Sequence, residues 1–244
     1  MRVVQLLFAV VAYLFFFASF LYLIGFVHNF MVPRSIDVGV AVPTLAAFVV
    51  NAALILLFGL QHSIMARPGF KTVLTRYWPE PIERSLYVLM TALVLCIFFI
   101  LWQPLPATVW SVEVTWLRGL LFAIAGLGWL IVLISTFLLN HFELFGLHQV
   151  WANFRDRAMP VMSFREPFFY RLVRHPIYTG FLLAFWSTPD MSQGHLFFST
   201  GMTLYILIGV YYEERDLKKH LGEVYVAYTR RVGMLIPGVG RNRS

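Results

Sequence analysis

The chain has 244 residues, of which 59% are apolar and 17% aromatic, and its mean hydropathy is +0.74. Soluble domains are usually about 45–50% apolar, so this composition excludes an ordinary soluble domain and predicts an all-α, polytopic integral membrane protein. The net charge is +7, yet the basic residues are spread over the loops without interleaved aromatic residues. This pattern argues against a nucleic acid partner and favours contact with an anionic lipid surface.

Six apolar runs follow one another along the chain, at about 6–28, 41–65, 86–103, 117–140, 175–188 and 195–213. They predict a bundle of five to six transmembrane helices, because a span needs about 20 apolar residues. The first run is too long for a signal peptide and is expected to remain as a span. The fifth run is short and ends at Ser187-Thr188-Pro189-Asp190, so the last two runs predict a C-terminal helical hairpin. The six runs take up most of the chain and leave no room for a second, soluble domain. We therefore expect a single domain over 1–244.

The basic residues are distributed asymmetrically between the loops. Of the 19 Lys and Arg residues, 17 fall at Arg2, in 66–84, in 143–174 and after 213, whereas only Arg34 and Arg118 lie on the other side. Cytoplasmic loops of membrane proteins are enriched in Lys and Arg. The sequence therefore predicts a protein of the bacterial inner (plasma) membrane with both termini in the cytoplasm.

Polar residues recur at the expected cytoplasmic ends of four spans. With the predicted orientation, helices packed side by side would bring these residues to one depth and into one pocket. The alternative is that they extend to the lipid headgroups, which explains single Arg residues but not His-Pro or Glu-Glu pairs. The four sets are Gln61-His62-Ser63, Asn140-His141, Arg174-His175 and Glu213-Glu214-Arg215.

His62, His141 and His175 at similar depth also allow a different function, namely a haem- or quinone-linked electron-transfer protein that uses His62 and His141. No H-x-x-x-H spacing on one helix supports metal binding, and the single cysteine, Cys96, supplies no Cys-based site. We predict no metal site. An NADPH-dependent reductase of the sterol type is a further alternative, and the sequence leaves both open.

The C-terminal part resembles a known superfamily. It contains Arg174-His175-Pro176-Ile177-Tyr178, an apolar hairpin, Glu213-Glu214-Arg215, Gly222-x-x-Tyr225-x-x-Tyr228 and Pro237. These motifs and their spacing resemble the isoprenylcysteine carboxyl methyltransferase superfamily of membrane enzymes, which use S-adenosylmethionine. Earlier segments resemble a narrower group, the bacterial methanethiol S-methyltransferase branch near the NnrU-like proteins. Those segments are 61–68, Glu83-Arg84-Ser85 and 140–147.

This resemblance implies S-adenosyl-L-methionine as the cofactor, with residues 1–142 as substrate-side spans and 143–244 as the cofactor-binding hairpin and tail. By position, the implied cofactor-binding residues are Gln149, Tyr170, His175, Pro176, Ile177, Tyr178 and Glu214, together with Glu213. Arg174 and Arg215 suit a forked contact to the cofactor carboxylate. Where the relatives carry an arginine for a carboxylate substrate, this chain has Val210 and Tyr211. The substrate implied is a small thiol, methanethiol, giving dimethyl sulfide, with an isoprenylcysteine-type carboxylate as the alternative.

A thiol with a pKa near 8.5 or above is mostly protonated at neutral pH, so its methylation needs a base or a cationic neighbour. His141 and His62 are the two candidate catalytic bases, because His175 has a cofactor role in the resemblance. The alternative for His141 is a structural one, as a cap of the fourth span or a partner of Glu143. The sequence leaves open which histidine acts, whether a metal assists, which thiol is used and what the oligomeric state is.

Overall fold

The computed structural model describes residues 1–40, 42–158 and 164–241. The chain forms two compact units. The first unit comprises Met1–Val109, His141–Pro160 and Ser192–Phe198, and the second comprises Trp110–Asn140, Val161–Met191 and Ser199–Ser244. Each is described by itself below.

Helices dominate the described residues, and five helical segments are long and apolar enough to cross a membrane. They are α1 (Arg2–His28), α2 (Thr44–Met65), the continuous segment of η1 (Glu80–Ile82) and α4 (Glu83–Leu101), α5 (Thr115–Leu139) and α9 (Gln193–Leu221). The predicted polytopic helical protein is therefore confirmed.

The fifth apolar run of the sequence forms a shorter helix than a full span. It is α8 (Pro176–Trp186), with 11 residues, which at 1.5 Å per residue extends about 16 Å, roughly half of a bilayer core. Pro176 occupies its first turn, and the helix ends at Ser187 before Pro189. After α8 the chain turns back into α9, and Ser199 Oγ donates to the Phe185 carbonyl at 2.9 Å. The predicted C-terminal helical hairpin is present.

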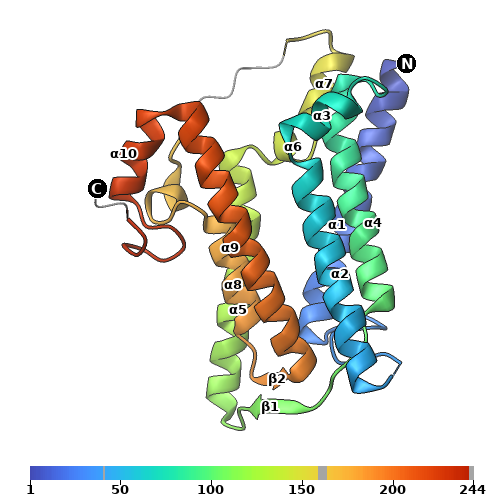
Figure 1. Cartoon of the computed structure of the whole chain (residues 1–244), viewed down its shortest axis with the longest axis vertical. Helices are drawn as coiled ribbons and strands as arrows, with labels where there is room; N and C mark the ends of the chain where they lie inside the picture. The colour runs from blue at the N-terminus through green and yellow to red at the C-terminus, as the bar shows by residue number, and fades with distance from the viewer. Residues whose placement is uncertain (41, 159–163, 242–244) are drawn as a thin grey trace. The chain divides into compact units, whose positions relative to one another are not determined.

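In the first unit, α4 packs against both α1 and α2, and the three helices run side by side (Figure 1). One part of its core is a set of aromatic rings in mutual contact, with the Phe98 and Trp102 ring centroids 5.1 Å apart. Phe26 and Phe198 complete this set. The buried Asn51 side chain donates to the Gln103 carbonyl at 2.8 Å and accepts from the Gln103 amide at 2.9 Å. Both ends of this polar side chain are thus satisfied inside an apolar bundle.

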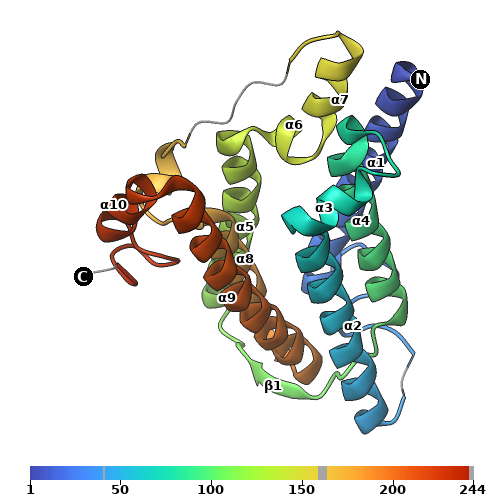
Figure 2. The same cartoon turned by 45° about the horizontal axis from the view of Figure 1, so that its top comes forward.

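Three short helices complete the first unit: α3 (Pro68–Leu74), α6 (His141–Leu144) and α7 (Leu147–Phe154). α7 lies beside the N-terminal part of α1 (Figure 2). The turn between α6 and α7 is held against α4, since Arg84 Nε donates to the Leu144 carbonyl at 2.7 Å. Gly146 has a φ of 89°, and a Cβ there would lie 2.6 Å from Ser85 Oγ. Only glycine fits this contact without strain, and the contact fixes the position of α6.

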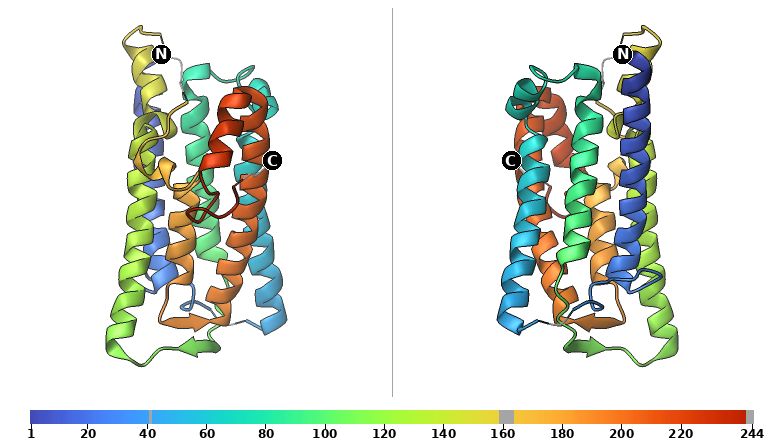
Figure 3. Two further views of the ribbon diagram at one scale, coloured as in Figure 1. Left: turned by 90° about the vertical axis from the view of Figure 1, so that its left-hand side faces the viewer. Right: turned by 90° about the vertical axis from the view of Figure 1, so that its right-hand side faces the viewer.

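In the second unit, α5 and α8 cross closely, as Figure 3 shows. Two glycines meet at the crossing: a Cβ on Gly128 would lie 2.6 Å from the Gly180 carbonyl oxygen, and the converse distance is also 2.6 Å. Small residues allow such close backbone approach between helices in membranes. Gly180 lies two residues after the 174–178 motif, so this crossing anchors the N-terminal part of α8.

A short two-stranded sheet, which the sequence analysis did not predict, pairs β1 (Thr108–Ser111) with β2 (Asp190–Ser192). Beside it, Arg118 binds Asp190 through a fork with N–O distances of 2.6 and 3.0 Å. These hydrogen bonds hold the pKa of Asp190 below its ordinary value. The ion pair fastens the strand to the N-terminal part of α5.

The C-terminal segment folds back onto the residues that precede α8. η2 (Phe168–Arg171) comes before the motif, and α10 (Glu223–Arg231) follows α9. The Arg174 amide donates to the Gly233 carbonyl at 2.8 Å, and the His175 amide donates to the Met234 carbonyl at 3.2 Å. Tyr225, Tyr228 and Val232 form a buried cluster with Phe164, Leu217 and Leu221. The tail is therefore part of the structure that supports the motif.

Candidate active site

Arg174 is 4% exposed and forms the centre of a buried polar cluster in the second unit. Its Nε donates to Glu214 Oε1 at 2.7 Å. Its Nη1 donates to the Val232 carbonyl at 2.6 Å, and both Nη atoms lie 3.2 Å from the Gly240 carbonyl. Arg174 comes directly before His175, the N-cap residue of α8. Its guanidinium thus connects this end of α8 with both α9 and the tail. Sequence reasoning assigned it a cofactor carboxylate, whereas in this structure its donors point to acceptors of the chain itself.

His175 and Tyr178 face the two glutamates of α9. His175 Nε2 lies 3.1 Å from Glu214 Oε1, and its Nδ1 lies 3.9 Å from Glu213 Oε2. Tyr178 Oη donates to Glu213 Oε2 at 3.0 Å. His175 is the N-cap residue of α8, and Pro176 and Ile177 form its first turn. Proline suits that position because the first helical residues need no amide donor. The structure therefore brings together Arg174, His175, Tyr178, Glu213 and Glu214.

Three buried tyrosines lie near this cluster. Tyr228 Oη donates to the Tyr170 carbonyl at 2.5 Å. Tyr225 is 2% exposed, and its hydroxyl has no hydrogen-bond partner among the described residues. Burial raises the pKa of all three, and the nearby glutamates add to this effect. Their hydroxyls remain protonated and can donate. Tyr170 was a predicted site residue, but the sequence analysis used Tyr225 only as a motif position.

Two further predicted residues differ in their surroundings. Gln149 belongs to the first unit, where its Nε2 donates to the Glu143 carbonyl at 2.9 Å. Its Oε1 is buried and has no partner among the described residues, so it can accept a hydrogen bond. The Arg215 side chain is 62% exposed and lies over the Tyr212 ring at 5.0 Å. Of the two arginines predicted to bind the cofactor, Arg215 is therefore the one with an accessible guanidinium, whereas Arg174 is buried.

His141, the first predicted base, opens α6 and is 5% exposed. Its Nε2 lies 2.8 Å from Tyr13 Oη of α1. The Phe145 ring packs on the imidazole with centroids 4.8 Å apart. Burial lowers the pKa of His141 below 6.5, so the imidazole is neutral at pH 7 and can accept a proton.

His62, the second predicted base, is held on several sides within α2. Its Nε2 lies 2.7 Å from Tyr87 Oη, and its Nδ1 lies 3.3 Å from Thr91 Oγ1. Its ring stacks on Phe58 with centroids 5.5 Å apart. Both ring nitrogens therefore have partners within the protein.

The two histidines flank one apolar cluster of the first unit. Met65, Tyr87 and Val88 form this cluster, and Phe145 packs against it. Since Phe145 contacts the His141 ring and Tyr87 contacts His62, each histidine meets the cluster through an aromatic side chain. The sequence analysis missed both Tyr13 and Tyr87. A tyrosine hydroxyl inside a membrane span needs a partner, and that need was the available signal.

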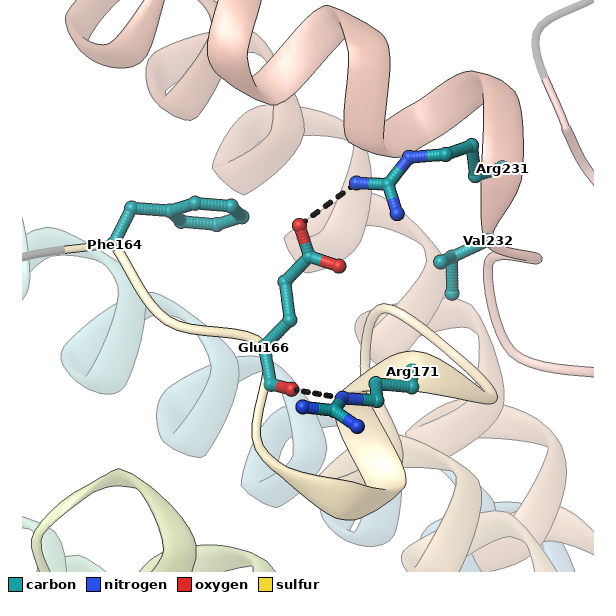
Figure 4. Close-up of a pocket in the computed structure, with 5 residues that line it drawn as sticks. All are labelled: Phe164, Glu166, Arg171, Arg231 and Val232. Atoms are coloured by element: carbon teal, nitrogen blue, oxygen red, sulfur yellow. Dashed lines mark hydrogen bonds and ion pairs between the residues drawn. The ribbon is translucent and has the colours of Figure 1, made fainter.

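A separate pocket of about 550 Å³ lies in the second unit (Figure 4). In it, Arg231 binds the Glu166 carboxylate at 2.9 Å, and Arg171 Nε donates to the Glu166 carbonyl at 3.1 Å. None of the site residues predicted from the sequence lines this pocket. Its lining residues are Phe164, Glu166, Arg171, Arg231 and Val232.

The described residues contain no group of three or more His, Cys, Asp or Glu side chains that could hold a metal ion. The buried polar cluster of the second unit offers acceptors for hydroxyl groups and hydroxyl donors. Such a cluster, buried at the end of apolar helices, defines a membrane enzyme.

The comparisons with known proteins agree with this class. The chain is 50% identical over 236 residues to the methanethiol S-methyltransferase of Pseudomonas sp. strain GM41, covering 97% of this chain and 91% of that protein. It is 46% identical over 236 residues to the methanethiol S-methyltransferase of Mycobacterium tuberculosis, covering 97% of each. Nurim of Sus scrofa is 30% identical over 177 residues, covering 69% of this chain and 67% of that protein. No family model and no solved structure matches. The chain belongs to the methanethiol S-methyltransferase family.

Proposed function

We propose that this protein transfers the methyl group of S-adenosylmethionine to a small thiol, converting methanethiol to dimethyl sulfide. The observation that carries the proposal is the 50% identity, over 97% of the chain, to a relative named for that activity. Both the 174–178 motif and the histidine-bearing segments lie within the matched length. The polar cluster of the second unit and the histidines of the first unit then have separate tasks.

The second unit fits the methyl donor, which supplies a methyl group on a sulfonium sulfur. Arg174 and His175 both contact Oε1 of Glu214, and Oε2 makes no hydrogen bond with any described residue. This oxygen and the half-exposed Glu213 suit ribose hydroxyls. The unpartnered Tyr225 hydroxyl offers a donor for a further polar group of the ligand.

The two arginines divide their roles in this proposal. Arg174 holds Glu214 and the tail in place, so it positions the site. Arg215, with its exposed side chain, is the one that can form a forked contact to the carboxylate of the donor. His175 orients Glu214 through Nε2 and so shares the positioning role.

The first unit fits the thiol. A thiolate that attacks a sulfonium removes both charges, so apolar surroundings favour the transition state once the thiolate has formed. The aromatic rings around His141 supply such surroundings, and the lowered pKa of His141 keeps it neutral and able to take the thiol proton at pH 7. We therefore propose His141 as the base, with His62 as the other candidate.

A carboxylate substrate of the isoprenylcysteine type fits less well. Val210 and Tyr211 stand where the carboxyl methyltransferases carry an arginine. Val210 is 1% exposed and apolar, and Tyr211 carries no positive charge. A buried carboxylate without a cation or donors would be costly, which supports a neutral nucleophile.

We further propose that the protein lies in the bacterial inner membrane with both termini in the cytoplasm. The support is the predominance of Lys and Arg in the terminal segments and in the loops 66–84 and 143–174, which the predicted topology puts on the same side. A reporter fused to the carboxyl terminus is expected to be active only in its cytoplasmic form. Activity of a periplasm-dependent reporter at that position would overturn the orientation.

The experiment that tests the activity is headspace mass spectrometry of the purified protein with S-adenosylmethionine and a panel of thiols. We expect dimethyl sulfide from methanethiol and the corresponding thioethers from other small thiols. A prenylcysteine analogue provides the comparison substrate. Methylation of its carboxylate, with none of the thiols methylated, would contradict the proposed function.

A further inference from the structure

Tyr13 of α1 and His141 of α6 form a pair from segments 128 residues apart in the chain. Tyr13 Oη lies 2.8 Å from His141 Nε2, and the two rings meet edge to face with centroids 5.7 Å apart. Tyr13 is half-buried, whereas His141 is 5% exposed. Tyr13 is therefore the more exposed residue of the pair.

The geometry limits how a proton can reach the imidazole. When the ring proton is on Nδ1, Nε2 is the basic atom, and the Tyr13 hydroxyl donates to it. The hydroxyl oxygen then occupies the direction of the Nε2 lone pair, so a thiol cannot hydrogen-bond to Nε2 directly. That oxygen still has lone pairs of its own and can accept from an S–H group.

We propose that Tyr13 relays the thiol proton to His141. The inference deepens the proposed thiol methylation and rests on it. Tyr13 is the group that contacts the substrate, and His141 is the final acceptor. Tyr13 is then a catalytic residue that lies outside all the family motifs recognised in the sequence.

The step balances in atoms and charge. The S–H bond of the thiol breaks and its proton binds Tyr13 Oη, while the original hydroxyl proton moves to His141 Nε2 and forms an imidazolium. The thiolate electron pair forms the new S–CH₃ bond, and the bond from that methyl to the sulfonium sulfur of the donor breaks. The products are a thioether and the neutral demethylated donor. His141 then releases its proton to water.

Charged groups also lie on the elements around His141. Glu143 of α6 lies 3.7 Å from His148 of α7, and Arg84 of α4 donates to the Leu144 carbonyl. Burial is the cause identified for the lowered pKa of His141. The apolar surroundings of His141 are thus the main influence on its pKa, and the Tyr13 hydroxyl is its polar contact on α1.

The chain offers two matched comparisons for Tyr13. Tyr22 also lies on α1, and its hydroxyl donates to the Arg34 carbonyl at 3.0 Å, away from both histidines. Tyr87 forms the corresponding pair with His62. The conservative changes Tyr13→Phe, Tyr22→Phe and Tyr87→Phe each remove one hydroxyl and keep the ring.

The experiment measures kcat and KM of the full-length protein in lipid nanodiscs for a series of thiols of decreasing pKa, with donor affinity measured by calorimetry. For methanethiol, we expect Tyr13→Phe to lower kcat by about 10- to 100-fold, the lower part of the range for acid–base catalysis. Donor affinity should be unchanged. The loss should shrink as the thiol becomes more acidic, because an ionised thiol needs no relay. A merely structural role would give the same loss for every thiol.

Each outcome decides the question. A loss with Tyr13→Phe that shrinks with thiol acidity, while Tyr22→Phe keeps wild-type rates, supports the relay. An equal loss for all thiols, or wild-type rates with Tyr13→Phe, overturns it. If Tyr87→Phe alone shows the dependence on thiol acidity, the relay to His141 is likewise overturned. Failure of the wild-type protein to methylate any thiol would contradict the proposed function itself, which separates that failure from failure of the relay.

Discussion

Arg174 and Glu214 form a buried ion pair in which Arg174 Nε donates to Glu214 Oε1 over 2.7 Å. Because His175 Nε2 contacts the same oxygen at 3.1 Å, the carboxylate is held in one orientation from two sides. Its other oxygen makes no hydrogen bond with the described residues. Arg174 also binds the tail, so the pair joins the tail to the carboxylate that we propose as part of the donor site.

Replacing Glu214 by Ala removes the proposed acceptor for ribose hydroxyls. We expect donor binding to weaken by about 1.5–3 kcal/mol, the range for a charge-assisted hydrogen bond. Glu214→Gln keeps one oxygen acceptor and should weaken binding less. Calorimetric titration with S-adenosylmethionine measures the affinity. Glu223→Gln, at an exposed position on α10, is the control. Wild-type affinity in Glu214→Ala would argue against the assigned role.

Replacing Arg174 by Met should destabilise the tail. The change leaves the Glu214 carboxylate without its buried partner and the Val232 carbonyl without its donor. Breaking a buried ion pair in this way typically costs about 3–5 kcal/mol. Denaturant unfolding in micelles measures the loss, and hydrogen exchange should show faster exchange in residues 232–241. Unchanged stability and exchange would mean that the tail is held by other contacts.

The residues of the polar cluster in the second unit could be singled out from the sequence, because the RHPIY motif and the two glutamates follow a family pattern in adjacent positions. The burial of Arg174 and His175 and their pairing with Glu214 could not be predicted from the sequence. The internal use of Arg174 depends on carbonyl groups of Val232 and Gly240, which any residue supplies, so no sequence pattern marks them.

Tyr13 shows a second reason why the sequence is insufficient. A lone tyrosine in an apolar run is typical of a lipid-facing or packing position. Its partner, His141, lies 128 positions away, and helical periodicity reports only the face of a helix, not its neighbour. Hydropathy likewise located the fifth apolar run, at 175–188, but overestimated the length of its helix. α8 has 11 residues, because it begins at Pro176 and ends before Ser187.

Replacing Gly128 by Ala should loosen the crossing of α5 and α8. The added Cβ would lie 2.6 Å from the Gly180 carbonyl oxygen, so one backbone must move. Overpacking of this kind costs about 1–3 kcal/mol. Gly126→Ala, where a Cβ meets nothing within 4 Å, is the matched control and should keep or slightly raise stability. Equal unfolding midpoints for the two variants would contradict the close crossing.

Replacing His141 by Ala should lower turnover by about 10²–10⁴-fold while donor affinity is nearly kept. In the wild type, burial lowers the His141 pKa below 6.5. The proposed base is therefore neutral at pH 7, and we expect kcat to fall only as acid protonates it, below pH 6.5. The contribution of the neutral imidazole to stability is lost over the same acid range. In His141→Ala the loss of turnover should shrink at high pH, where solvent supplies thiolate. Normal turnover of His141→Ala with an inactive His62→Ala would move the base to α2.

The most direct test of thiol methylation uses S-adenosylmethionine with a deuterated methyl group and unlabelled methanethiol. The purified protein is incubated with both, and the headspace is examined by mass spectrometry. We expect dimethyl sulfide that carries one deuterated methyl group, formed at a rate proportional to the amount of enzyme and lowered in His141→Ala. Dimethyl sulfide without the label, or no volatile product while the protein binds the donor, would contradict it.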